Sequence, residues 1–401
     1  MTIDADSDVY YDPYDVDLNA DPYPMFRRLR ESEPLYYNAE HDFYALSRYD
    51  DVDAAYIDHV TFSSARGAVL EIIKSGMDIP PGTLIFEDPP IHNIHRKLLS
   101  RIFTPRKVTA LEPKIREFTA RCLDPLVGTG HFDFVKDLGA QMPMRVIGML
   151  LGIPEADQAH VVEHGDSTLR TERGGKMTEN PNGAIATGEV FAEYIDWRAD
   201  HPSDDIMTEL LTAEFADETG ATRRLGRDEL LLYLQVIATA GSETTTRLLG
   251  WAGKVLAEHP DQRRDLVTNR TLLPAAIEEL VRFEPPAPHV SRYVARDVSY
   301  YGRTVPAGSA MMLLVGAANR DPRRFGHDSE EFNIHREPHQ HLGFGVGTHF
   351  CLGNALARLE GRIALDEILD RFPEWEVDLT DAELSPTSTV RGWESMPAVL
   401  P

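Results

Sequence analysis

Apolar residues recur along most of this chain at the spacing expected of amphipathic helices. Positions that return every three or four residues predict helices over 112–122, 142–151, 191–198, 230–258 and 354–372. Shorter aromatic and β-branched runs between turn formers predict strands over 34–38, 43–47, 290–295, 298–301 and 310–315. The chain is therefore expected to be mainly α with a small β region, an α+β fold class.

The remaining segments bear on domain organisation. Residues 1–20 are acidic and rich in tyrosine, and we expect a flexible N-terminal lead there. Residues 173–183 are rich in turn formers, and we expect an exposed loop. A length of 401 residues would allow two domains, but no stretch has the composition of a linker. We therefore expect a single domain over 21–401.

Charge and hydropathy exclude several classes of function. The chain has 65 acidic and 40 basic residues and a net charge of −25, which disfavours nucleic acid and anionic membranes as partners. The most apolar run, 230–241, is shorter than the roughly 20 residues that span a bilayer. No secretory leader is recognisable, and the two cysteines offer no disulfide framework. We expect a cytoplasmic protein without a membrane anchor.

The stretch 344–353, Phe-Gly-Val-Gly-Thr-His-Phe-Cys-Leu-Gly, carries the most chemical information. It places Cys351 in a glycine-rich turn directly ahead of the predicted helix 354–372. The partial positive charge at a helix N-terminus stabilises a thiolate. A thiolate can be the axial ligand of haem iron, whereas most lone cysteines are inert core residues. Cys351 is therefore a candidate metal ligand.

This stretch resembles the haem-binding loop of the cytochromes P450, the haem-thiolate monooxygenases, in its pattern Phe-Gly-x-Gly-x-His-x-Cys-x-Gly. The resemblance runs from about residue 22 to the C-terminus and is to the bacterial type without an anchor. It implies a triangular helix-rich body beside a small β region, with haem b between a long central helix and the cysteine loop. By this match Phe344, His349, Cys351 and Gly353 belong to the cofactor site.

Residues 240–246, Ala-Gly-Ser-Glu-Thr-Thr-Thr, place poor helix formers in the middle of the longest predicted helix. A threonine hydroxyl can bond the carbonyl one turn back and bend a helix. The segment resembles the family's oxygen-activating segment, in which Glu243 and Thr244 would relay protons and Ala240 and Gly241 would border the cofactor. Cleaving O–O to leave water needs two protons, which an acid beside a hydroxyl can deliver. On its own, the segment could equally be a buried threonine-rich helix.

Glu279 and Arg282 are three residues apart on one predicted helix face. Such pairs are usually solvated and contribute under about 1 kcal/mol. In this order ahead of Cys351 they resemble the family's Glu-x-x-Arg, which supports the core beneath the haem. By the same resemblance a downstream arginine joins them, and either Arg323 or Arg324 could serve.

Haem propionates require cationic or donor partners. The resemblance assigns this role to His92, Arg96, Arg292 and His349. No flavin or iron–sulfur motif is present, so electrons are expected from an acidic ferredoxin with an NAD(P)H-dependent reductase. Residues 91–111 contain five basic and no acidic residues, which suits a ferredoxin-docking patch, although a solvated basic face is the alternative.

The segment 65–86 is apolar and interrupted by glycine and proline, which predicts a mobile lid. The family places a substrate-contact loop here. The residues expected to line the substrate are Val69, Leu84, Ile85, Phe86, Ile237, Pro288, His289, Val290 and Trp393. This wall predicts a hydrophobic organic substrate, and the resemblance implies hydroxylation as the expected reaction. Arg66 and Lys74 could meet a carboxylate, although loop cations are usually solvated.

Two other functions stay open. A peroxygenase driven by hydrogen peroxide needs no external protons, so the pair Glu243 and Thr244 disfavours it. A haem-thiolate sensor or ligand-binding protein needs the cysteine loop but neither Thr244 nor a docking patch. The partners expected for the monooxygenase are a hydrophobic small molecule, dioxygen and the ferredoxin, and we expect a monomer.

Overall fold

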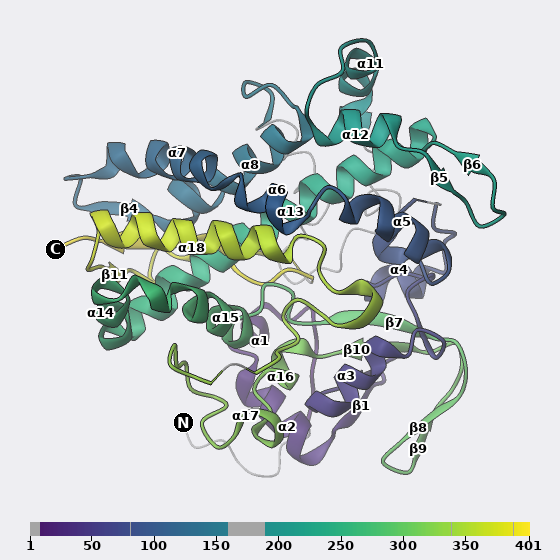
Figure 1. Cartoon of the computed structure of the whole chain (residues 1–401). Coiled ribbons are helices and arrows are strands. Elements are labelled where there is room, and N and C mark those ends of the chain that lie inside the picture. The colour runs from purple at the N-terminus through teal and green to yellow at the C-terminus, as the bar shows by residue number, and fades with distance from the viewer. Residues whose placement is uncertain (1–8, 81, 159–188, 338, 388) are drawn as a thin grey trace.

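The computed structural model describes residues 9–80, 82–158, 189–337, 339–387 and 389–401. Figure 1 shows a helical body crossed by a long central helix, with a small β region to one side. The expected loop 173–183 and residues 1–8 of the expected lead lie outside the described ranges. The mainly α architecture with small sheets is the one that the periodicity of the chain predicts.

The longer helices carry the body. They are α2 (Tyr23–Ser32), α3 (Tyr49–Ile57), α5 (Ile91–Ser100), α7 (Glu112–Leu123), α8 (Met142–Leu151), α11 (Ala192–Asp200), α13 (Arg227–Glu258), α14 (Pro260–Thr268), α15 (Leu273–Phe283) and α18 (Asn354–Arg371). Shorter ones are α1 (Val16–Ala20), α4 (Leu70–Ser75), α6 (Pro105–Thr109), α12 (Ile206–Thr212), α16 (Val315–Ala318) and α17 (Pro322–Phe325). All five predicted helices are confirmed. Helix α13 begins at Arg227, earlier than predicted, because the Glu229 carboxylate accepts from the Gly226 N–H at 2.7 Å.

The main sheet has the strand order β1-β2-β10-β7-β3. Its strands are β1 (Leu35–Asn38), β2 (Phe43–Leu46), β3 (Phe62–Ser63), β7 (Val290–Val294) and β10 (Ala310–Leu313). Strand β10 runs parallel to β2 and antiparallel to β7. The smaller sheets are formed by β4 (His131–Asp133) with β11 (Glu376–Val377) and β14 (Pro397–Val399), β5 (Phe215–Ala216) with β6 (Thr222–Arg223), β8 (Val298–Tyr300) with β9 (Arg303–Val305), and β12 (Glu383–Leu384) with β13 (Trp393–Ser395). The five predicted strands are confirmed, whereas short strands such as β3 and β9 were not predicted.

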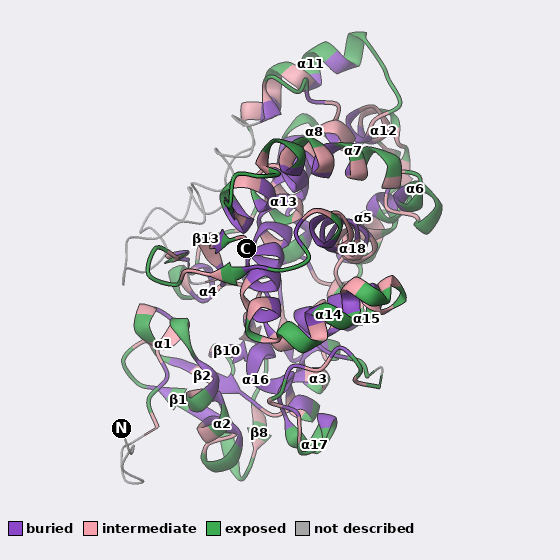
Figure 2. Cartoon of the chain, turned by 90° about the vertical axis from the view of Figure 1, so that its left-hand side faces the viewer, coloured by how far each residue is buried: buried purple, intermediate pink, exposed green. Residues whose placement is uncertain are grey.

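Helix α13 is the centre of the body, and Figure 2 shows its buried surface running through the middle of the molecule. It packs against α8, α18 and the π-helical turn η3 (Phe134–Gly139). Glycines permit this close approach: a Cβ on Gly241 would lie 2.5 Å from Ile147 Cδ1, and one on Gly253 would lie 2.5 Å from Phe134 Cγ. The helix continues through the threonine-rich segment, where the Thr244 hydroxyl donates to the Ala240 carbonyl at 2.8 Å.

Residues 9–20 differ from the flexible lead expected for this stretch. They include α1, and Tyr11 is 1% exposed with its ring 5.6 Å from that of Phe26. The Arg391 guanidinium donates to the Asn19 carbonyl at 2.6 Å. Two of the three tyrosines of this segment, Tyr11 and Tyr14, are therefore part of a buried aromatic cluster, whereas Tyr10 is exposed.

Candidate active site

The cysteine loop brings Cys351 to the start of α18. Gly345 and Gly347 have φ values of +66° and +70°, which only glycine adopts readily, and the Cys351 N–H donates to the Phe344 carbonyl at 2.8 Å. Burial raises the pKa of the Cys351 thiol, while the Gly353 N–H and the Arg96 guanidinium oppose that rise. A thiol in this position would lose its proton on binding a metal ion.

A cavity of about 260 Å³ lies between the cysteine loop and α13. Cys351 and Phe344 line it from the loop side, and Thr244, Thr245 and Leu248 line it from α13. Gly353 contributes through its N–H to the sulfur, not through a wall of the cavity. The space is therefore bordered by a thiol on one face and a helix on the other, as an axially ligated planar cofactor requires.

Donor groups without acceptors gather at one edge of this cavity. The rings of His92 and His349 lie 4.3 Å apart, and among the described residues neither nitrogen of His92 nor Nε2 of His349 has a hydrogen-bond partner. Burial, followed by the nearby Arg292, lowers the pKa of His349 to about 3. Arg292 is 4% exposed and donates to the Ser291 carbonyl, with no ion pair in the described part of the chain.

Buried donors and cations of this kind need anionic acceptors. Arg96 lies near enough to Cys351 for the two to interact electrostatically, and burial lowers the pKa of its guanidinium. The cluster of His92, Arg96, Arg292 and His349 therefore fits the two propionates of haem b. The residues of this chain suit the cofactor that the cysteine loop implies.

Glu243 and Thr244 lie where α13 passes the cavity. Thr244 also lines a second cavity, described below, so it stands between the two spaces. Glu243 is 3% exposed, and its carboxylate accepts from Arg247 Nη2 at 3.3 Å. Arg247 Nη2 also donates to Glu394 at 2.8 Å and thereby ties the acid to β13. The absence of a side chain on Gly392 makes room for this arginine, since a Cβ there would lie 2.6 Å from Arg247 Cβ.

The second cavity, of about 310 Å³, lies on the other side of Thr244 and is mostly apolar. The predicted substrate-lining residues in its wall are Val69, Ile85, Phe86, His289 and Val290. Sequence reasoning missed several others, which are Pro13, Tyr14, Glu71, Gln235 and Thr389. Gln235 carried a signal, because it is the polar residue within the most apolar run of the chain.

Four residues expected to line the substrate are not among those that line this cavity. Leu84 and Ile237 belong to the main buried core, and the Trp393 ring packs 5.3 Å from that of Trp251. The Pro288 carbonyl accepts from the Gly316 N–H at 2.8 Å. The pattern of apolar residues could not tell which side chains line the cavity and which pack in the core, because both environments are apolar.

Two small residues of α13, Ala240 and Gly241, were expected to border the cofactor, and the structure places them elsewhere. Ala240 lines the second cavity rather than the one above Cys351. Gly241 faces Ile147 of α8, where a Cβ would clash, and it is not among the described residues that line the cavity above Cys351. The two cations considered for carboxylate binding are engaged elsewhere, since Arg66 lies 5.9 Å from the Tyr293 ring and Lys74 bonds Asp42 at 2.5 Å.

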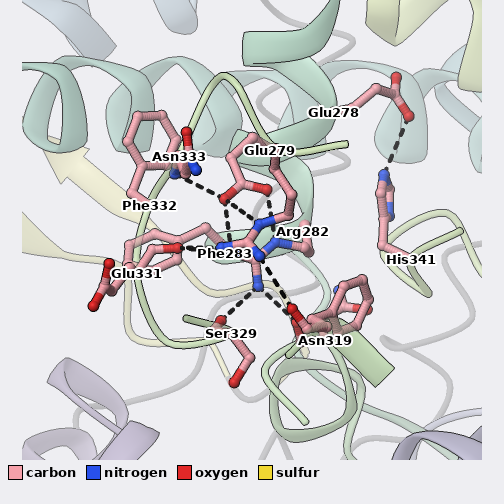
Figure 3. Close-up of polar contacts among 12 residues, drawn as sticks. Glu278, Glu279, Arg282, Phe283, Asn319, Ser329, Glu331, Phe332, Asn333 and His341 are labelled. Carbon is pink, nitrogen blue, oxygen red and sulfur yellow. Dashed lines mark hydrogen bonds and ion pairs between the residues drawn. The ribbon is translucent and has the colours of Figure 1, made fainter. Parts of the chain in front are cut away.

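Glu279 and Arg282 form a buried network rather than a surface pair (Figure 3). Both side chains are under 5% exposed, and their two hydrogen bonds are 2.7 Å long. Arg282 also donates to the carbonyls of Asn319, Ser329 and Glu331.

The third member of the network is Arg336, which donates to Glu279 at 3.2 Å. The expectation of Arg323 or Arg324 was wrong. Arg323 is exposed beside Asp321, and Arg324 lies over the Tyr49 ring. The next residue along, Glu278, joins a separate cluster with His341 and Arg358, and these partners overcome burial to lower its pKa to about 2.

The basic stretch 91–111 lies on α5, on α6 and between them. Lys97, Arg101, Arg106 and Lys107 are exposed, and Lys107 pairs with Glu209 at 2.7 Å. Arg96 differs from them because it is half-buried toward Cys351. The exposed cations thus lie on the elements that cover the cysteine side of the cavity.

Among the described residues, no helix is long and apolar enough to cross a membrane. The family model for cytochrome P450 matches residues 189–394. The chain is 36% identical over 399 residues to putative cytochrome P450 123 of Mycobacterium tuberculosis, covering 98% of this chain and 97% of the relative. It is 34% identical over 388 residues to the cyclomarin C epoxidase CymV of Salinispora arenicola, covering 96% and 97%.

Comparison with solved structures leads to the same family. The structure of CYP109E1 from Bacillus megaterium with testosterone matches at a TM-score of 0.85 and 29% identity, covering 95% of this chain and 98% of that one. The hydroxylase HmtN of himastatin biosynthesis matches at a TM-score of 0.80 and 32% identity, covering 94% and 96%. The chain therefore belongs to the cytochrome P450 family, the haem-dependent monooxygenases.

Proposed function

We propose that this enzyme inserts one atom of dioxygen into a hydrophobic organic substrate, most simply by hydroxylation, with residues 21–401 acting as one catalytic domain. The observation that carries the proposal is that a mostly apolar cavity adjoins the cavity above Cys351. Five residues line both, namely Ala68, Ile85, Thr244, Ala287 and Val290. A substrate in the apolar cavity would therefore border the site of oxygen chemistry.

The cofactor site has a clear division of roles. Haem bound through Cys351 would supply dioxygen binding and the oxidising power. Arg96, Arg292, His92 and His349 would hold its propionates, which anchors the plane of the ring against the cavity walls. The N–H of Gly353 donates to the sulfur and tempers its negative charge.

Protons would reach the oxygen site through Glu243 and Thr244. Thr244 holds its hydroxyl at the boundary of the two cavities, while Glu243 lines the substrate cavity beside it. Arg247 donates to the Glu243 carboxylate at 3.3 Å and so holds the acid beside Thr244. A peroxygenase or a ligand sensor has no need for this pair, so its presence favours the oxygen-dependent reaction.

Named relatives support an organic substrate of natural-product or steroid size. One is an epoxidase acting on cyclomarin C, one is a hydroxylase of himastatin biosynthesis, and one was solved with testosterone. The apolar wall of the cavity agrees with such molecules, because burial of apolar area dominates ligand binding in concave sites.

Turnover tests this proposal. Compounds that convert the ferric haem from low to high spin would be selected from a library and incubated with ferredoxin, reductase and NAD(P)H. We expect oxygenated product carrying one atom from labelled dioxygen. Product that forms equally well with hydrogen peroxide alone, and survives Thr244→Val, would instead support the peroxygenase.

An acidic ferredoxin is the electron donor that the charges favour. The exposed cations of α5 and α6 contrast with the net charge of −25. We expect Arg101→Glu to slow reduction at low salt and to flatten its salt dependence. Arg303→Glu, on the distant β9, is the control, and equal reduction rates in the two variants would refute the docking patch.

A further inference from the structure

Gln235 places a buried amide in the wall of the substrate cavity. The residue is 5% exposed and lies in α13. Its Nε2 donates to the Thr239 hydroxyl at 2.8 Å, and within the described residues its Oε1 has no hydrogen-bond partner. Buried polar atoms are nearly always satisfied, so an acceptor left open beside a cavity indicates a partner that enters the cavity.

Two further hydroxyls of the same cavity are in the same state. Ser291 Oγ, on β7, and Thr389 Oγ1, ahead of β13, are buried without a partner in the described part of the chain. These three groups come from separate elements and converge on one space. The apolar wall is therefore marked by neutral polar groups, a pattern that fixes the orientation of a ligand.

The charges of the cavity exclude an anionic ligand. Its described lining contains the carboxylates Glu71 and Glu243 and neither lysine nor arginine. The nearby cations, Arg66 and Lys74, are directed to the Tyr293 ring and to Asp42. A carboxylate brought into this space would lose its hydration and meet two like charges.

We infer that the cavity binds a neutral hydrophobic alcohol, whose hydroxyl bonds the Gln235 amide while its carbon skeleton extends toward Thr244. A hydroxyl is both donor and acceptor, so it satisfies the amide whichever way the amide is turned. Gln235 and Thr244 are nine residues apart on α13, which is about 13 Å at a rise of ~1.5 Å per residue. This spacing sets the distance between the hydroxyl that Gln235 binds and the carbon that is oxidised. The inference rests on the proposed function.

The test uses three ligands whose carbon chains have the same length and whose end groups differ, namely dodecan-1-ol, dodecane and dodecanoate. Each is titrated into the haem-loaded enzyme, with the spin-state change and calorimetry as readouts. We expect the alcohol to bind about tenfold more tightly than the alkane, the effect of one hydrogen bond to a buried group, and the carboxylate to bind most weakly. In Gln235→Leu the preference for the alcohol over the alkane should disappear.

Gln158→Leu is the control. Gln158 is also a buried glutamine whose Oε1 has no partner within the described ranges, but it donates to the Ile153 carbonyl and is not among the described residues that line the cavity. This variant should keep the preference for the alcohol. Ligand-free Gln235→Leu should melt no lower than the wild type, because it removes a buried open acceptor, whereas a structural role for Gln235 predicts a lower melting temperature.

Two outcomes overturn the inference. One is an unchanged preference for the alcohol in Gln235→Leu, and the other is dodecanoate binding as tightly as the alcohol. Failure of the proposed function is recognised separately, because it would appear as missing oxygenated product in an enzyme that still distinguishes the three ligands.

Discussion

The cysteine side and the substrate side of the active site are built on opposite principles. Around Cys351 lie buried imidazole nitrogens without a partner among the described residues, such as those of His92, and the buried cation Arg292, which suits an anion. In the described lining of the substrate cavity, the polar groups of Gln235, Ser291 and Thr389 that lack a partner are neutral, and the acidic side chains Glu71 and Glu243 occur without lysine or arginine. The difference indicates that the cavity above Cys351 suits one anionic cofactor, whereas the substrate cavity suits an uncharged ligand.

The two sides also differ in how they are assembled. The cysteine side uses a contiguous loop held by glycines of positive φ, and α15, which lines the same cavity through Val281, carries the buried pair Glu279 and Arg282. The substrate side collects residues from the N-terminal segment, α4, α13 and β7. The metal ligand thus lies in one continuous stretch of chain, whereas the substrate wall is assembled from separate segments.

The largest effect on stability is expected from breaking the buried network of Glu279 and Arg282. Arg282→Ala leaves the Glu279 carboxylate buried with one partner fewer and should lower the free energy of unfolding by about 3–5 kcal/mol. The milder Glu279→Gln should show part of this loss in chemical denaturation. Arg224→Ala removes an ion pair with Glu214 in which both side chains are exposed, and it should cost less than about 1 kcal/mol. Equal losses in the exposed and buried variants would contradict the network.

The next effect concerns the boundary between the two cavities. Thr244→Val should reduce product formation about 100-fold, the usual contribution of a positioned proton donor, and divert NAD(P)H oxidation to hydrogen peroxide. The control is Thr246→Val, whose hydroxyl bonds the Gly139 carbonyl away from both cavities. Oxygen and peroxide electrodes measure the diversion, and full coupling in Thr244→Val would remove this residue from the proton path.

Removal of one cation should weaken cofactor retention without touching the substrate cavity. Arg292→Leu is expected to speed haem loss to apomyoglobin about tenfold, because a charge-assisted hydrogen bond to a propionate is lost. Arg296→Leu, an exposed neighbour on the same segment, serves as the control. Haem loss at the wild-type rate in Arg292→Leu would mean that the open donors do not meet propionates.

The smallest effect is a dependence on pH. The pKa of Glu278 falls from 4.5 to about 2 on folding, so its contribution to stability is complete above pH 4.5 and is lost as pH falls toward 2. Glu278→Gln should flatten the unfolding free energy across this interval. A slope that persists unchanged in the variant would show that Arg358 and His341 do not stabilise this carboxylate.

The same contrast explains what sequence could and could not predict. Cys351 and His349 are neighbours in a short motif, so their joint placement follows from local structure alone. Leu84 and Trp393 were expected in the substrate wall but face the core, because that choice depends on distant packing. Arg336 was missed for the same reason, since it reaches Glu279 across 57 residues of chain. Tyr14 lies in a segment whose composition resembled a flexible lead, although its ring is buried.

The central claim is a bond between the Cys351 sulfur and haem iron. The most direct measurement is the visible spectrum of the reduced carbonyl adduct of the reconstituted enzyme, compared with that of Cys351→His. The account predicts the red-shifted Soret band of thiolate ligation in the wild type and its absence in the variant. A wild-type adduct without that band, or a polypeptide that binds no haem, would contradict the account.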